Sequence, residues 1–402
     1  MRNYVILKTF CKKIYWVGSG NFWYEEGVIR DDNSIFYKIF NHSLFLTYGF
    51  MTLLEILAAL IGDFPEDEKS DSITFAVSHT IVMIKIFSVI SNKKLVKKLI
   101  RDLIKVCELY EDNSLMVEKY RIMKINFVAY VFTVYGCTAC FVFEGLRKMS
   151  VGSHFVTIVT YYPSYRDDSL LAVITRITTT FVLLIMMLTM IVSVDCFALA
   201  NLIIFKYKFI TLRGYFEKLR EDFDKLLEMG NPRRAAKQLT QGLIAGIVMH
   251  KELIRISKEI DKAFGTILAL QLFQSSGSAV SLLLQIALSD QLTLVAQMKI
   301  LFFIFALFFL LGLFLCNAGD ITYQASLLSD SIFYCGWHSC PSQYPNKARR
   351  NLGLLVLQAC AQSQRPIVMK AFKMLELTYA TFLLVRLRGT YSVFALIYAQ
   401  NQ

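Results

Sequence analysis

Apolar residues come in long uninterrupted blocks along this chain, and the blocks have the length of membrane-spanning helices. Residues 125–143, 177–194, 263–289 and 300–319 carry no charged side chain. A helix needs about 20 apolar residues to cross the hydrocarbon of a bilayer. Lipid offers backbone groups no hydrogen-bond partner, so spans must be helices or closed barrels, and continuous apolar blocks exclude the alternation of a barrel. The pattern predicts an all-α polytopic membrane protein.

We expect seven transmembrane helices, at about 38–61, 72–91, 122–145, 170–205, 264–288, 298–318 and 370–398. Charged residues interrupt the second and seventh of these. The composition supports the prediction, because 55% hydrophobic and 18% charged residues make the chain more apolar than a typical soluble domain.

The charges in the connecting segments predict the orientation of the spans. The segments after the second and fourth spans are rich in lysine and arginine, whereas those after the first and fifth are acidic or neutral. Because basic loops stay in the cytosol, we expect a cytosolic N-terminus and an extracellular C-terminus. This is opposite to a G-protein-coupled receptor. The inner segments also account for the net charge of +12, so no nucleic-acid partner is indicated.

Two basic connectors repeat apolar residues at helical spacing, KKLVKKLIRDLIKVCELY and GLIAGIVMHKELIRISKEIDKAF. Both run directly into membrane spans, which predicts that spans 2 to 5 extend as helices into the cytosol and pack there as a bundle. The alternative is that they lie as basic amphipathic helices on anionic lipid.

No catalytic motif is present. The sequence has no phosphate-binding glycine loop, no HExxH and no G-x-S-x-G. Cys335, His338 and Cys340 are too few for a zinc site. We therefore expect no catalytic residues, no cofactor and no metal.

The last third of the chain carries several motifs in a fixed order. The segment FLCNAGDITYQASLLSDSIFYCGWHSC has Cys316 and Gly319 at the end of a span, and the chain nears its end in TYSVFALI. These motifs, together with several other positions, resemble the insect odorant receptor family. The other matching positions are Ser326, Tyr334, Trp337, Gln364, Arg365, Pro366, His250, Phe264 and residues 271–276.

The resemblance implies a subunit of a ligand-gated, non-selective cation channel in which four subunits surround one pore. Residues 1–37 would be a cytosolic N-terminal segment, and 38–326 the ligand-binding bundle of spans 1–6. Residues 327–365 would belong to a cytosolic anchor, and 366–402 to the pore-lining last helix with an extracellular tail. The implied location is the plasma membrane of a sensory neuron dendrite, where membrane lipid surrounds the bundle.

The resemblance also implies the roles of residues in the last helix. Aligning its terminal motif places Tyr391, Phe394 and Ile397 at the pore, with Phe394 near the hydrophobic gate. The shared odorant co-receptor has a glutamine filter where this chain has Ile397. An isoleucine cannot replace a cation's water, so this chain is expected to sense the odorant and to rely on co-receptor subunits in a heterotetramer.

Arg386 and Arg388 interrupt the same helix. If this helix lines a water-filled pore, the two arginines can face water, which removes the free-energy cost of burying ionisable groups at membrane depth. Alternatively, the two arginines pair with acids on neighbouring helices or extend along a subunit boundary.

A ligand pocket is implied in the outer half of the bundle, mostly apolar and with a few hydroxyls or one imidazole. Helical phasing groups candidate residues on shared faces without saying which face points inward. The ligand would be a small apolar volatile. The candidates are Ala76, His79 and Met83; Tyr135, Thr138 and Val142; Ile174, Thr178 and Phe181; and Phe273 and Ser276.

Three other functions stay open. A gustatory-type channel would respond to a contact tastant, a metabotropic seven-helix receptor would have no pore of its own, and a transporter would take up its ligand without ligand-gated current.

Overall fold

The computed structural model describes residues 3–18, 20–25, 28–62, 64, 66–150, 160–164, 167, 169–288, 293–340, 345–372, 374–385, 387 and 391. Helices make up nearly all of these residues, with two short antiparallel hairpins. The elements are α1 (Asn3–Trp16), β1 (Phe22–Glu25), β2 (Val28–Asp31), α2 (Ile35–Ile61), α3 (Glu66–Ser91), α4 (Lys93–Lys105), η1 (Glu108–Tyr110), α5 (Asn113–Ser150), α6 (Leu170–Glu228), α7 (Pro232–Leu288), α8 (Leu294–Ser326), α9 (Leu328–Phe333), η2 (Trp337–Ser339), α10 (Asn346–Ser363), β3 (Lys370–Ala371) and β4 (Leu375–Glu376).

Six of the described helices are long and apolar enough to cross a membrane, and they contain the first six predicted spans. Three of them begin at a hydroxyl residue that satisfies an orphan amide of the first turn. The side chains of Ser34, Ser169 and Thr293 accept hydrogen bonds from backbone amides three residues further on in α2, α6 and α8. Large apolar side chains such as Leu46, Phe132 and Phe305 are exposed on these helices, as a lipid-facing surface requires. The chain is a multi-pass membrane protein.

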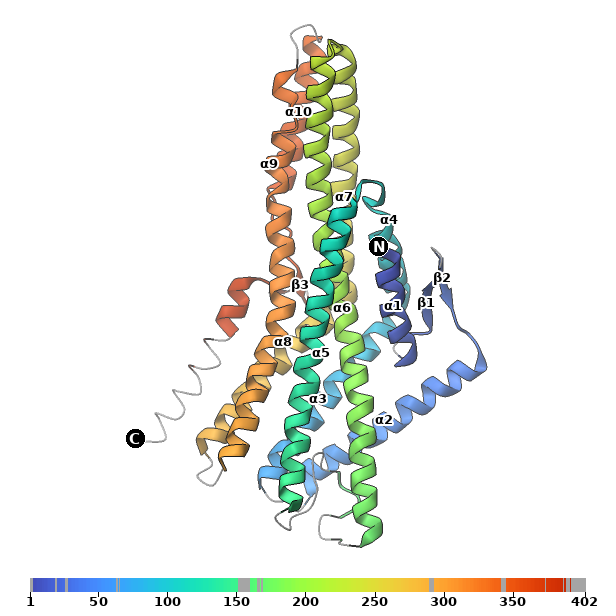
Figure 1. Ribbon diagram of the computed structural model, residues 1–402, viewed down its shortest axis with the longest axis vertical. Helices are drawn as coiled ribbons and strands as arrows, with labels where there is room; N and C mark the ends of the chain where they lie inside the picture. The colour runs from blue at the N-terminus through green and yellow to red at the C-terminus, as the bar shows by residue number, and fades with distance from the viewer. Residues whose placement is uncertain are drawn as a thin grey trace.

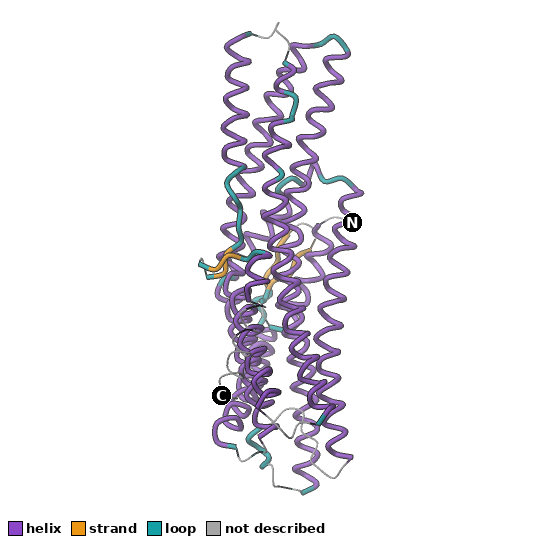
Figure 2. Tube along the Cα trace, turned by 90° about the vertical axis from the view of Figure 1, so that its left-hand side faces the viewer, coloured by secondary structure: helices purple, strands orange, loops and turns teal. Residues whose placement is uncertain are grey.

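Two of the helices continue far beyond their apolar spans. With 59 and 57 residues, α6 and α7 form an antiparallel pair whose ends lie beside α9 and α10 at the top of Figure 1. Figure 2 shows most of the long helices running along the same axis. The predicted extension of these two span helices is confirmed. We call the part of α6 after Lys206, the part of α7 before Asp261, and α9 and α10 the distal bundle.

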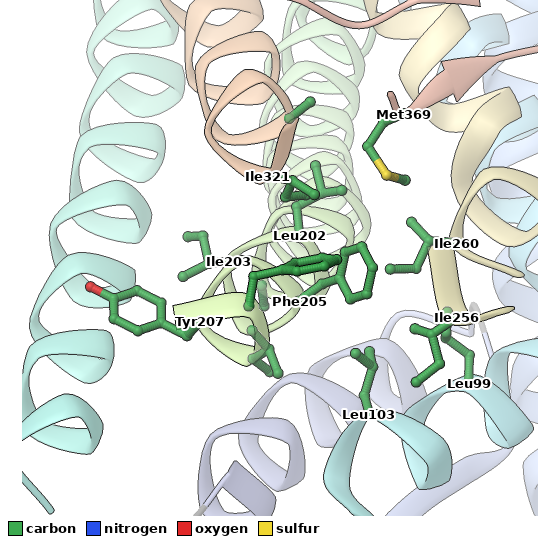
Figure 3. Packing of buried hydrophobic residues seen from close by; sticks show 14 of the residues in the cluster. Leu99, Leu103, Leu202, Ile203, Phe205, Tyr207, Ile256, Ile260, Ile321 and Met369 are labelled. Carbon is green, nitrogen blue, oxygen red and sulfur yellow. The ribbon is translucent and has the colours of Figure 1, made fainter. Parts of the chain in front are cut away.

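The first basic connector, KKLVKKLIRDLIKVCELY, packs on protein. At Asn92 the chain leaves α3, and α4 begins as a separate helix, so the predicted extension of the second span as one continuous helix is wrong. Figure 3 shows its Leu99 and Leu103 facing Ile256 of α7 and Phe205 of α6, all four side chains being buried. Because this apolar face is covered by α6 and α7, α4 does not use it to lie on lipid. Its lysines and Arg101 occupy the other face.

The seventh predicted span differs from the prediction at its start. The strands β3 and β4 pair here as an antiparallel hairpin, and helix begins at Tyr379. The backbone amide of Lys370 donates to Asp261 of α7, and Phe372 has a positive φ of 50°, so the chain turns here instead of entering a helix. Helix is described for residues 379–385, and the remainder of this span lies largely outside the described residues.

Gly246 of α7 packs closely against Phe216 of α6, and this contact leads to a prediction. A Cβ at Gly246 would lie 2.4 Å from Cζ of the buried Phe216, whereas a Cβ at Gly214 would meet nothing within 4 Å. We expect Gly246→Ala to lower the free energy of unfolding by about 1–3 kcal/mol through overpacking. We expect Gly214→Ala to raise it by about 0.5–1 kcal/mol, because alanine favours helix. Thermal unfolding of the detergent-purified proteins measures both, and equal shifts would contradict the close packing.

Candidate functional site

A cavity of about 100 Å³ lies between α3, α5, α6, α7 and α8. One water needs roughly 10–15 Å³ of such space, so the cavity can hold a small organic molecule. Its walls are mainly aromatic and aliphatic. The apolar residues that line it are Phe75, Val134, Cys137, Phe141, Leu184, Leu188, Ile191, Phe303, Ala306, Leu307 and Leu310.

One wall of the cavity contains Asp195, which forms a buried charge pair with Lys85, and two polar residues that hydrogen-bond to this pair. Lys85 of α3 donates to both carboxylate oxygens of Asp195 in α6, at 3.0 and 2.9 Å, and to Oε1 of Gln271 in α7, at 2.6 Å. The Tyr130 hydroxyl of α5 donates to Asp195 at 2.6 Å. All four side chains are buried, and all except Lys85 line the cavity. Four helices therefore meet at one neutralised pair, which a membrane interior tolerates far better than a single charge.

A second polar pair holds the imidazole that lines the cavity. His79 Nδ1 of α3 contacts a carboxylate oxygen of Glu55 in α2, and both side chains are buried. The Tyr48 hydroxyl donates to the backbone carbonyl of His79 at 3.3 Å. Since Glu55 orients the ring, His79 presents a fixed polar edge to the cavity.

Two of the eleven predicted ligand residues, His79 and Thr138, line the cavity. Ala76 is buried beside His79 on α3 without lining the cavity, and Met83, Val142 and Ser276 are partly buried. The remaining five side chains are exposed on the outside of the bundle: Tyr135, Ile174, Thr178, Phe181 and Phe273. A ligand role for any of the eleven stays a prediction.

The predicted pore residues lie at the end of the described chain. Tyr391 is helical and its side chain is exposed. Phe394 and Ile397 lie outside the described residues, as do Arg386 and Arg388.

Sequence reasoning did not assign Glu55 or Asp195 to the site and treated Lys85 only as an interruption of a span. The signal that could have found them is the same in each case. Each is an ionisable residue inside a long apolar stretch, and such residues at membrane depth need a partner or a function. In contrast, no group of three or more potential metal ligands occurs among the described residues.

The last helix is fastened to α8 at the Cys316–Gly319 motif. A Cβ at Gly319 would lie 3.0 Å from the ring of Tyr379, so glycine allows the close approach of the two helices. The Tyr379 hydroxyl donates to Asp320, whose other carboxylate oxygen accepts from Lys206 of α6 at 3.0 Å. These polar contacts thus join the last helix to α8 and α6.

The hairpin before the last helix is held by a carboxyl at its border with the distal bundle. Asp261 of α7 accepts a 2.9 Å hydrogen bond from the backbone amide of Lys370. Burial raises the pKa of Asp261 to about 6, while the hydrogen bond and the charge of Lys370 oppose the rise. The folded state therefore binds this proton more tightly than the unfolded state does, and the carboxyl lowers stability as the pH rises between about 4 and 6.

Asp261→Asn tests this effect. Asparagine keeps an oxygen that accepts from Lys370 and has no charge to desolvate. Allowing for the partial exposure of the carboxyl, we expect the variant to exceed the wild type in unfolding free energy by about 1–2 kcal/mol at pH 7.5. The difference should shrink toward pH 4. Thermal unfolding of both proteins from pH 4 to pH 7.5 measures it, and a constant difference would contradict the titration of Asp261.

Comparisons with known proteins find a matching family model and solved structures with a similar fold. A family model described as 7tm Odorant receptor matches residues 67–391. The solved structure of the insect olfactory receptor OR5 from Machilis hrabei superposes with a TM-score of 0.75 at 10% identity, covering 98% of this chain and 99% of that one. The same receptor in complex with eugenol gives a TM-score of 0.72 at 12% identity, with 99% of each chain covered. A search of curated proteins finds no match.

Proposed function

Because this chain belongs to the odorant receptor family, we propose that it is the odorant-sensing subunit of a heteromeric, ligand-gated, non-selective cation channel. The odorant binds in the cavity between α3, α5, α6, α7 and α8, and His79 and Thr138 contact it. The cavity in this position, with apolar walls and a few fixed polar groups, is the observation that carries the proposal. The similar receptor from Machilis hrabei is described in complex with eugenol, a small oxygenated aromatic molecule, which supports a ligand of this size.

The proposal includes an orientation in the plasma membrane of a sensory neuron. The N-terminus and the distal bundle lie in the cytosol, and the C-terminus lies outside. Basic residues support this, since Lys94, Lys98, Arg101 and Lys105 form an exposed stripe on α4. Residues 327–365, which include α9 and α10 of the distal bundle, contribute to an anchor between subunits.

Opening follows from a difference in affinity for the odorant between the closed and the open state. The last helix, within residues 366–402, lines the pore. The contact of Tyr379 with Asp320 joins that helix to α8, and α8 also supplies Ala306 and Leu310 to the odorant cavity. One helix therefore touches both the ligand site and the base of the pore helix.

Co-receptor subunits complete the channel as a heterotetramer. The resemblance of the terminal motif implies that Ile397 stands where the co-receptor has a filter glutamine. An aliphatic side chain offers a cation no oxygen to replace its hydration shell. This chain therefore supplies the odorant site, and the co-receptor supplies the filter.

Whole-cell current tests the proposal in cells that express this chain alone or with an odorant co-receptor. The challenge is a panel of volatile esters, terpenoids, alcohols and eugenol. We expect odour-evoked cation current only on co-expression. Robust current from this chain alone would contradict the role of Ile397. Ligand uptake without current would instead favour a transporter.

A further inference from the structure

Ser78 on α3 presents an unpaired hydroxyl group in the odorant cavity. The residue is 7% exposed and lines the cavity, and its Oγ has no hydrogen-bond partner among the described residues. A buried polar atom without a partner is rare enough in proteins to need an explanation.

Neighbouring hydroxyl groups behave differently. Thr80 on the same helix donates to the carbonyl of Ala76 at 2.8 Å, and Thr138 donates to Val134 at 3.0 Å. Bonding to the carbonyl four residues earlier is the usual arrangement for hydroxyls in membrane helices. The Ser78 hydroxyl makes no such bond, so its donor is available to a molecule in the cavity.

The accepting oxygens of Asp195 and Gln271 in the cavity wall are already engaged. Asp195 accepts from Lys85 and Tyr130, and Oε1 of Gln271 accepts from Lys85. The charges of Lys85 and Asp195 neutralise each other, which leaves an ionised ligand without a counter-charge in an apolar space. The walls around Ser78 include Phe75, and α5 adds Phe141.

We propose that Ser78 determines the chemical class of odorant by donating a hydrogen bond to an oxygen of the bound molecule. The ligand is neutral, has a compact apolar or aromatic body, and carries one accepting oxygen, as a ketone, ester, ether or alcohol does. Hydrocarbons of the same shape bind more weakly because they leave the hydroxyl unpaired in a low-dielectric site. This inference rests on the proposed odorant-sensing function.

Probes of matched shape test the inference. Acetophenone and its secondary alcohol carry an oxygen where isopropylbenzene carries a methyl group. Each is applied to cells that express the co-receptor with the wild type, Ser78→Ala or the control Thr80→Ala. The control removes a hydroxyl that is satisfied within its own helix. Thermal stabilisation of the purified chains by each probe is measured in parallel.

In the wild type we expect the half-maximal concentration for acetophenone to be about five- to tenfold below that for isopropylbenzene, equal to about 1–1.4 kcal/mol. Ser78→Ala should reduce this ratio to less than about twofold, and Thr80→Ala should keep it. Ser78→Cys, a weak donor of similar size, should give an intermediate ratio and serves if the alanine variant fails to fold.

Three results would overturn the inference: equal potency of the probes on the wild type, an unchanged ratio in Ser78→Ala, or no stabilisation by any oxygenated probe. If the probes discriminate in stabilisation but evoke no current, the inference on Ser78 stands and the channel function fails. The two proposals are thus separated by the second readout.

Discussion

Replacing Asp195 by leucine is expected to remove most of the folded protein from the cell surface. Among the described residues, the substitution leaves the buried ammonium group of Lys85 with only Gln271 as a partner, and it removes the acceptor of the Tyr130 hydroxyl. Removing one member of a buried ion pair costs about 3–5 kcal/mol, a large part of the 5–15 kcal/mol that stabilises a typical domain. Surface labelling and thermal unfolding in detergent measure the loss.

Two further variants separate charge from packing. Lys85→Met combined with Asp195→Leu removes both charges, so we expect it to recover much of the lost stability. Asp224→Leu lies further along the same helix, where Asp224 pairs with Arg220 at 3.7 Å and both side chains are about half exposed. That pair contributes at most about 1 kcal/mol. If the Asp195 variant were as stable as the Asp224 variant, the buried pair would not hold the four helices together.

Tyr379→Phe is expected to raise the basal current and lower the half-maximal odorant concentration of the co-expressed channel. We assign to the closed channel the hydrogen bond that the Tyr379 hydroxyl donates to Asp320 between the last helix and α8. A hydrogen bond to a carboxylate at this partly exposed position contributes about 1–2 kcal/mol to the state that has it. Its loss shifts the equilibrium toward opening by roughly 5- to 30-fold in each subunit.

The control for this variant is Tyr323→Phe. Tyr323 lies on α8 with 55% of its surface exposed, and the substitution removes the same hydroxyl. We expect its basal current and odorant response to match the wild type. A Tyr379→Phe channel with lower basal current would mean that the contact belongs to the open state, and an unchanged channel would mean that the contact does not participate in gating.

Much of the fold could be predicted from the sequence because lipid imposes one solution on an apolar stretch. Between the first and last turns of α2, α3, α5, α6, α7 and α8 the backbone groups find their partners inside the same helix, so length and hydropathy were sufficient to locate the first six spans. The same holds for the extension of α7, whose apolar residues repeat at helical spacing. The family followed from short motifs such as Cys316–Gly319, and the structure gives this motif a physical reason in the close approach of Tyr379.

Which helix face points inward was decided only by tertiary structure. Periodicity groups residues on a face, but in a membrane both faces are apolar, so hydrophobicity does not tell the interior from the lipid side. On α5 the cavity face contains Val134, Thr138 and Phe141, whereas the neighbouring Tyr135 points outward. A rotation of 100° per residue is enough to exchange a lining residue for an exposed one.

The sequence also did not show which residues far apart in the chain pair with each other. Lys85 and Asp195 are 110 residues apart, and each on its own is an unfavourable charge in its span. Only the packing of α3 against α6 and α7 joins them, and only the position of the β3–β4 hairpin delays the last helix to Tyr379. The sequence by itself therefore determined the helices, their lengths and the family, because these depend on local hydrogen bonding and on local motifs. The tertiary structure decided the cavity, its charge pair and the unpaired hydroxyl of Ser78, because these depend on contacts between residues far apart in the chain.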